Sequence, residues 1–279
     1  MRHRNRLPIP ARLLPAAALA ALLASAASAC TTMGPTPATT GFTARPMPRA
    51  GLDVQVGLVP GHNLSSSVVE SPDGNSIKQL SAAAQFDELI GIPGLVLGAR
   101  VFGNEGDTPL EPVIGYRREL GDGVASLAGF LFGTHAEHEE YGASYAVTRL
   151  GGELAGDVRV LEHRWVEPHV FGGFNVHHLS ADGTYCTDAN MQWAEDCPEP
   201  DEPVKPVVSS SVEGTFPSAH VGIAAEIMRH GDSWFHGGRI AFMAAGGVMP
   251  HVESTMQSDN ESYFSFGLTL SVGIGAGDE

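Results

Sequence analysis

The sequence predicts an all-β fold: a closed antiparallel up-and-down transmembrane β-barrel of ten strands, with eight strands as the alternative. Successive segments alternate apolar residues with small or polar ones at a period of two, the pattern of a strand with two unlike faces. In the clearest case, from Phe264 to Ile274, every second residue is apolar and the residues between are Ser, Gly or Thr. Long amphipathic helical patterns are missing, and 34 glycines indicate frequent turns.

The first 29 residues predict a signal peptide that is removed from the mature protein. They hold Arg2, Arg4, Arg6 and Arg12 but no acidic residue, and an apolar Leu/Ala run follows over 13–24. The whole chain has 16 Lys and Arg against 32 Asp and Glu, so cleavage leaves 12 against 32, a formal net charge of −20. We do not expect so acidic a chain to bind nucleic acid.

Three cysteines suggest a lipid and a disulfide. The stretch AASAC, which ends at Cys30, resembles a bacterial lipobox, and this resemblance implies that Cys30 becomes a diacylated first residue. The alternative is a secreted protein without a lipid. Cys186 and Cys197 lie in one polar loop and form a natural disulfide pair in an oxidising compartment, which leaves Cys30 as the odd cysteine.

Two further units follow the signal peptide. Residues 30–50 are rich in Thr, Pro and Ala without periodicity, which predicts a disordered tether. Residues 51–279 form the barrel domain. No mature segment has 18 consecutive apolar residues, so no transmembrane helix is expected.

Alternating segments predict the strands in order along the barrel domain. They span 52–58, 78–88, 95–101, 114–119, 126–132, 143–161, 166–177, 221–227, 239–248 and 264–274. The Ala-rich run 78–88 also fits a short helix, and without it nine strands remain, which close poorly. Short connections alternate with longer polar ones at 61–77, 103–109, 134–142, 183–214 and 251–261, as in an up-and-down barrel with all long loops at one end.

The polar face decides which way the strands point. Between 143 and 161, Leu150 and Leu154 alternate with Arg149 and Glu153. The polar face is mostly Gly, Ser, Thr and Ala with scattered charges, which suits the crowded inside of a narrow barrel, so the apolar face is expected to meet lipid. Aromatic residues near strand ends would form the interfacial girdle: Phe130, Phe132, Tyr145, Trp165, Phe174, Trp234, Phe264 and Phe266.

The charged residues of the polar face predict a network that plugs the lumen, because a buried charge requires a partner. Its expected members are Arg100, Arg117, Glu119, Arg149, Glu153, Asp157, Arg159, Glu167, Glu226 and Arg239. Such a plug predicts little conductance; a selective pore or a catalytic cluster is the alternative.

The pattern from Leu52 to Gly277 resembles that of small bacterial outer-membrane β-barrels of the OmpA/OmpX-like kind. The resemblance lies in pattern rather than in a motif, and the chain ends in GAGDE where such barrels usually end on an aromatic residue. It implies a place in the bacterial outer membrane with the longer loops outside the cell.

Catalytic, cofactor and metal motifs are missing from the sequence. No G-x-S-x-G, H-E-x-x-H or P-loop occurs, and His135 and His138 lie among glutamates with a spacing that fits no fixed metal site. The function predicted is therefore non-enzymatic: an envelope or surface-interaction protein with acidic loops, without a motif that identifies a partner. The alternative is a soluble, lipid-anchored lipocalin-like or β-sandwich protein that binds an apolar ligand.

Overall fold

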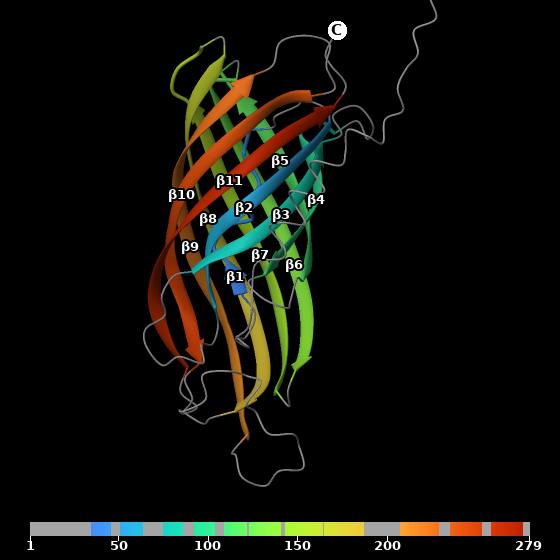
Figure 1. Ribbon diagram of the computed structural model, residues 1–279, viewed down its shortest axis with the longest axis vertical. Helices are drawn as coiled ribbons and strands as arrows, with labels where there is room; N and C mark the ends of the chain where they lie inside the picture. The colour runs from blue at the N-terminus through green and yellow to red at the C-terminus, as the bar shows by residue number, and fades with distance from the viewer. Residues whose placement is uncertain are drawn as a thin grey trace, which may run out of the picture.

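A computed structural model describes residues 35–45, 51–63, 75–85, 92–103, 109–121, 123–140, 143–163, 165–186, 207–228, 235–252 and 258–275. Ten strands in this part of the chain, β2 to β11, form one closed antiparallel barrel (Figure 1). Each strand pairs with the next along the chain, and β11 closes the barrel by pairing with β2. The strands are β2 Gly51–Asn63, β3 Asn75–Gln85, β4 Leu95–Gly103, β5 Leu110–Leu120, β6 Ala125–Glu140, β7 Ala143–Arg159, β8 Val166–Cys186, β9 Val207–Met228, β10 Phe235–Val252 and β11 Ser258–Gly275.

This architecture confirms the ten-stranded up-and-down barrel. The ambiguous run over 78–88 is part of strand β3, paired with β2 and β4 on its two sides. The connections β3–β4, β5–β6, β7–β8 and β9–β10 meet at one end of the barrel, called the turn end here, and the opposite end is called the loop end.

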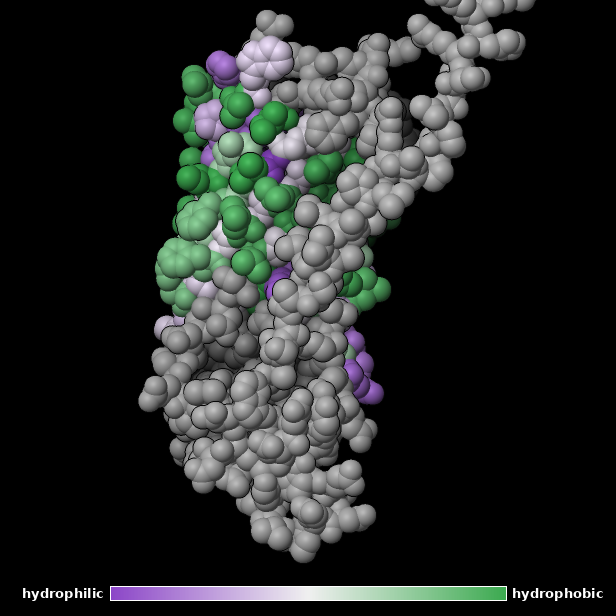
Figure 2. Space-filling model, viewed as in Figure 1, coloured by the Kyte–Doolittle hydropathy of each residue, from purple (hydrophilic) through white to green (hydrophobic). Residues whose placement is uncertain are grey.

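Apolar side chains point outward and charged ones inward. Leu154 is 70% exposed and Leu270 is 44% exposed, whereas Arg149 and Glu153, on the opposite face of β7, are each 2% exposed. Figure 2 shows apolar side chains gathered over the wall around β10 and β11. The predicted orientation, with apolar side chains outward and charged side chains inward, is therefore confirmed.

Strand β6 corrects this assignment locally. The sequence pattern predicts Phe130 and Phe132 on the outer, apolar face, but both are buried in the lumen, and Leu127 and Leu131 are exposed instead. Both faces of β6 are apolar, so alternation alone cannot select the outer one. Within the predicted girdle, Trp165, Phe174, Phe264 and Phe266 are exposed; the side chains of Tyr145 and Trp234 lie outside the described residues.

Luminal glycines make room for the aromatic rings of β6. Phe130 pairs directly with Gly115 on β5, and Phe132 pairs with Gly151 on β7. A Cβ added at Gly115 would lie 2.3 Å from the Phe130 ring, and one at Gly151 would lie 2.6 Å from the Phe132 ring. Each ring thus lies over a glycine of the neighbouring strand, which explains why small residues alternate on the inner face.

The wall of the barrel is uneven in height. Strands β2 to β5 have 9 to 13 residues, whereas β6 to β11 have 16 to 22. The extra length lies at the loop end, where β8 and β9 continue into the predicted polar loop over 183–214 and β6 continues through His135 and His138 (Figure 1). Among the described side chains, the outward residues there are polar, such as His135 and Glu137 on β6 and Ser211 and Glu213 on β9, which hides the alternation.

Candidate functional site

The lumen is occupied by an N-terminal part of the chain itself. Residues 35–45, called the luminal segment here, begin with β1 (Pro35–Pro37), in which Pro35 pairs with Asn63 at the loop end of β2. The segment ends at Arg45, whose Nη1 donates a hydrogen bond of 2.8 Å to the carbonyl oxygen of Gly123 in the β5–β6 turn. The luminal segment therefore passes through the barrel from the loop end to the turn end.

This placement differs from the disordered tether that the sequence predicts over 30–50. Ala38 and Thr40 have 0% exposure, and Thr36, Thr39 and Phe42 are also buried. The segment has no strand or helix periodicity because its first half is held mainly through backbone groups, which every residue type carries. The composition of these residues alone therefore predicts an unstructured chain.

Four barrel side chains donate hydrogen bonds to consecutive carbonyl oxygens of the luminal segment. The donors are Arg149 to Pro37 at 2.8 Å, Ser218 to Ala38 at 2.7 Å, Arg100 to Thr39 at 2.5 Å and Gln79 to Thr40 at 3.0 Å. These donors come from β7, β9, β4 and β3, so they surround the segment. Thr39 and Thr40 lie beyond the end of β1, so without these donors their buried carbonyls would be left unsatisfied, at a cost of about 1–3 kcal/mol each.

Glu153 receives the donors of the same stretch. Its carboxylate accepts hydrogen bonds from the Thr39 hydroxyl at 3.0 Å and from the backbone N–H of Thr40. Asn175 donates to it at 3.5 Å, and Nε2 of His220 lies 3.8 Å away. One buried carboxylate thus fixes the point where the segment turns.

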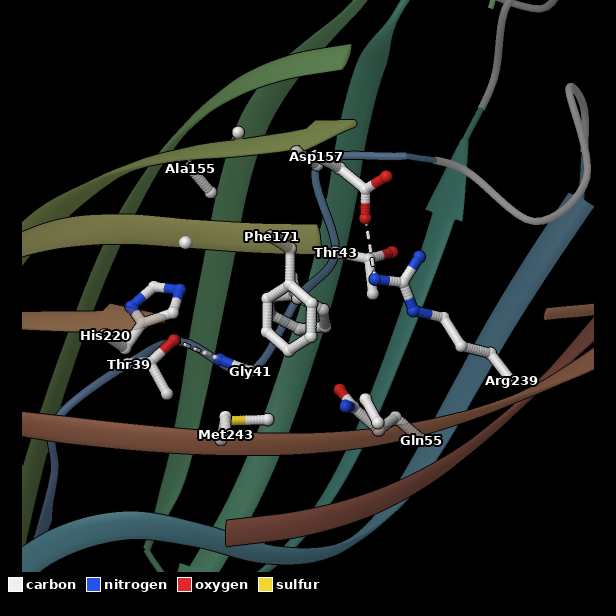
Figure 3. Close-up of a pocket in the computed structure, with 15 residues that line it drawn as sticks. Thr39, Gly41, Thr43, Gln55, Ala155, Asp157, Phe171, His220, Arg239 and Met243 are labelled. Carbon is white, nitrogen blue, oxygen red and sulfur yellow. Dashed lines mark hydrogen bonds and ion pairs between the residues drawn. The ribbon is translucent and has the colours of Figure 1, made fainter. Parts of the chain in front are cut away.

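Gly41 makes that turn. Its φ is +76°, a left-handed conformation that side chains disfavour, and a Cβ there would lie 2.2 Å from the Gln79 side-chain nitrogen. Its N–H donates to the Thr39 hydroxyl at 3.1 Å, as Figure 3 shows.

Phe42 fills an apolar patch on one side of the lumen. Its ring lies 5.8 Å from that of Phe130, centroid to centroid, with the two planes tilted by 44°. The buried apolar residues of this cluster are Phe42, Ala44, Ala83, Val96, Val113, Ala128, Phe130, Phe132 and Ala155. The predicted lumen was polar throughout, and this patch was not anticipated.

Arg45 joins an ion network at the turn end. It lies 3.4 Å from Glu167 and 3.7 Å from Glu226. Deeper in the lumen, Asp157 accepts a hydrogen bond from Arg239 at 2.6 Å (Figure 3) and contacts Nδ1 of His169 at 2.7 Å. Nε2 of His169 lies 3.5 Å from Glu226, so the histidine links the two carboxylates.

A second network lies nearer the loop end. Glu111 is fully buried and accepts a hydrogen bond from Nε of Arg100 at 2.7 Å, while Arg149 lies 3.4 Å from the same oxygen. Both guanidinium groups lie over the Phe132 ring, at 5.5 Å and 4.5 Å from its centroid. The two arginines that bind the luminal segment are therefore themselves fixed by a carboxylate and an aromatic ring.

The structure places most predicted network residues in the lumen. Arg100, Arg117, Arg149, Glu153, Asp157, Glu167, Glu226 and Arg239 are buried. Arg159 lies at the turn-end rim, 3.3 Å from Glu167. Glu119 is exposed, so its assignment to the lumen is wrong: it lies one residue from the end of β5, where the strand reaches the surface.

Charges in the lumen balance when the missed residues are included. Among the described side chains, six arginines face six carboxylates in the lumen or at its rim. They are Arg45, Arg100, Arg117, Arg149, Arg159 and Arg239 against Asp53, Glu111, Glu153, Asp157, Glu167 and Glu226. Arg45 was missed because it lies in the Thr/Pro-rich stretch, and Glu111 because it lies just outside the predicted strand. The acidity of the chain, −16 overall, thus arises outside this network.

A small cavity lies beside the luminal segment. This cavity between the luminal segment and the wall is lined by Phe42, Asp157, Phe171, His220, Arg239 and Met243 among others (Figure 3). The space left in it for water molecules is about 20 Å³, room for roughly one or two waters.

Other predicted features lie outside the described residues. These are the signal peptide, Cys30, Cys197 and the Cys186 side chain, so the lipid and the disulfide stay predictions. In the described part of the chain, no group of three or more His, Cys, Asp or Glu side chains is arranged to hold a metal ion. No helix among the described residues is long and apolar enough to cross a membrane.

No protein-family model matches the chain, and no curated protein is significantly similar to it.

Proposed function

We propose that this protein is a non-enzymatic β-barrel of the bacterial outer membrane, whose lumen is closed by its own N-terminal segment. The observation that carries this proposal is the outer apolar belt. On β9 the outward residues from Pro217 to Ile227 are Pro, Ala, Val, Ile, Ala and Ile, an 11-residue span, and a tilted membrane strand requires about 9–11 residues.

The belt ends at the same level on neighbouring strands. On β8 the outward apolar residues run from Val166 to Val176, and these pair with Ile227 and Pro217 of β9. Beyond them the outer face becomes polar on both strands, with His178 opposite Thr215. Such a shared boundary is expected of a barrel that meets the edge of a bilayer, whereas a water-exposed wall has no reason to change character at one height.

The closed lumen favours an envelope role over a channel or a ligand carrier. The cavity between the luminal segment and the wall has space for roughly one or two waters, which is too small for an apolar ligand, because such a ligand typically requires a pocket of about 300 Å³ or more. The lipid at Cys30 and the Cys186–Cys197 disulfide belong to this proposal and are supported by the sequence alone.

The gel mobility of unheated and boiled protein tests membrane insertion. We expect unheated protein from outer membranes to migrate differently from boiled protein, because a closed barrel resists detergent. Identical migration, with release of the Cys30→Ala variant into the soluble fraction, would favour a tethered soluble domain. Planar-bilayer recordings test closure: we expect no steady conductance from the wild type, and a large one would contradict the plug.

A further inference from the structure

The luminal segment gives the N-terminal part of the chain a direction through the barrel. Pro35 pairs with Asn63 at the loop end, and Arg45 reaches Gly123 at the turn end. Residues 46–50 then lead to Gly51, where β2 begins at the turn end. Everything before Pro35 is thus attached to the chain at the loop end of the lumen.

Chain length limits how far Cys30 lies from that point. Five residues extend at most about 18 Å, since a fully extended chain spans about 3.3–3.6 Å per residue. The turn end lies farther away: β2 runs 13 residues from Gly51 to Asn63, about 40 Å along the strand or about 30 Å along the axis of a tilted barrel. A lipid on Cys30 therefore cannot reach the bilayer surface at the turn end.

We propose that Cys30, if lipidated, anchors the protein in the membrane leaflet on the loop side, so that the lipid and the long loops lie on the same face of the membrane. This inference rests on the proposed membrane function. With the long loops outside the cell, as in other barrels of this architecture, the lipid would belong to the outer leaflet, and the protein would be a lipoprotein displayed at the cell surface.

The luminal contacts hold the segment in this direction. Four side-chain donors on consecutive carbonyls, with Glu153 on the opposite side, fix Pro37 to Thr40. Phe42 and Arg45 are fixed beyond the turn at Gly41. Ala38 and Thr40 are fully buried and donors from four strands surround them, so we expect the barrel to close around a segment already in place.

Three epitope insertions in the full chain test the sidedness: one after Met33, one after Glu162 in the β7–β8 turn, and one after Asn190 in the β8–β9 connection. Antibody binding is measured on intact cells and after the outer membrane is permeabilised. We expect the tags at 33 and 190 to behave alike and the tag at 162 to behave oppositely. A tag at 33 that behaves like the tag at 162 would overturn the inference while leaving the membrane barrel intact.

Failure of the membrane barrel has a different signature. If all three tags bind equally and heating does not alter gel mobility, the proposed function fails and this inference fails with it. Should the tag at 33 prevent folding, Thr32→Cys in a Cys186→Ser/Cys197→Ser background provides the same readout with a membrane-impermeant maleimide.

The lipid is tested separately. Radioactive palmitate should label the wild type, and Cys30→Ala should lose this label completely while its tag at 33 keeps the same sidedness. Persistent label would show that the lipid is elsewhere, and a tag that changes sides would show that the lipid, rather than the luminal contacts, directs the segment.

Discussion

The two halves of the luminal segment are held in different ways. From Pro37 to Thr40 the barrel binds the backbone, with donors to four carbonyls and Glu153 accepting from an N–H and a hydroxyl. After Gly41 the barrel binds side chains: Phe42 packs in the apolar patch and Arg45 reaches Glu167 and Glu226. The first half depends on the residues of the wall, the second on its own residues.

The two halves therefore differ in which substitutions destabilise them. In the backbone-bound half, most side chains of the segment can change if the wall is kept, because carbonyl contacts do not depend on side-chain identity. In the side-chain-bound half, single substitutions remove whole contacts.

Deletion of residues 35–45 removes both halves together and should have the largest effect. Five arginines and six carboxylates then remain without the segment's carbonyls and hydroxyl, and the lumen opens to water. We expect steady conductance in planar bilayers, absent from the wild type, and a lower unfolding temperature. An equally long deletion in the 187–206 connection is the control, which should stay closed. A closed deletion variant that still shows a heat-dependent gel shift would mean that the wall itself seals the lumen.

Phe42→Ala tests the side-chain-bound half. It leaves a cavity among packed rings, so we expect the free energy of unfolding to fall by about 3–5 kcal/mol, the usual cost of truncating a buried phenylalanine. Urea unfolding in detergent micelles measures it. Phe266→Ala is the matched control, since Phe266 is 51% exposed on the outer face and detergent fills the space it leaves. Equal losses in the two variants would mean that the luminal patch contributes no special stability.

The sequence predicts the barrel better than it predicts the plug, for a physical reason. The ten strands and the outward apolar face follow from a period of two, which Phe264 to Ile274 or Leu150 to Leu154 display without a partner. The parity of β6 does not, because Phe130, Leu131 and Phe132 are all apolar. Gly115 opposite Phe130 and Gly151 opposite Phe132 make room for the two rings on the inner side.

The candidate site shows the same division between local pattern and three-dimensional packing. Eight of the ten predicted network residues are buried, since an inward charge on an alternating strand is visible in the sequence. The luminal segment, which this network binds through backbone groups, lies in the Thr/Pro-rich stretch and shows no side-chain pattern in the sequence. Only Phe42 and Arg45, the one aromatic and the first basic residue of 31–50, could have indicated that this stretch packs against something.

Thr39→Val tests a side-chain hydrogen bond within the backbone-bound half. Thr39 is the side chain there that donates to Glu153, so its loss should cost about 2 kcal/mol of unfolding free energy, as for a hydrogen bond to a charged group. Thr40→Val is the control: among the described residues the Thr40 hydroxyl has no hydrogen-bond partner, and we expect a change within about 0.5 kcal/mol. A larger loss for Thr40→Val than for Thr39→Val would mean that the Thr39–Glu153 hydrogen bond is not the side-chain contact that stabilises this half.

Arg45→Gln should have the smallest effect among the variants that remove a contact. The side chain is 12% exposed at the turn-end rim, and Arg159 and Arg239 also lie near Glu167 and Glu226, so these carboxylates keep a cationic neighbour without Arg45. We expect a loss of about 1 kcal/mol of unfolding free energy that shrinks further in high salt. Arg118→Gln, an exposed arginine on β5, is the control and should change less. A loss as large as that of Phe42→Ala, unaffected by salt, would contradict this. It would mean that the ion pairs of Arg45, rather than the packing of Phe42, contribute most to the stability of the second half.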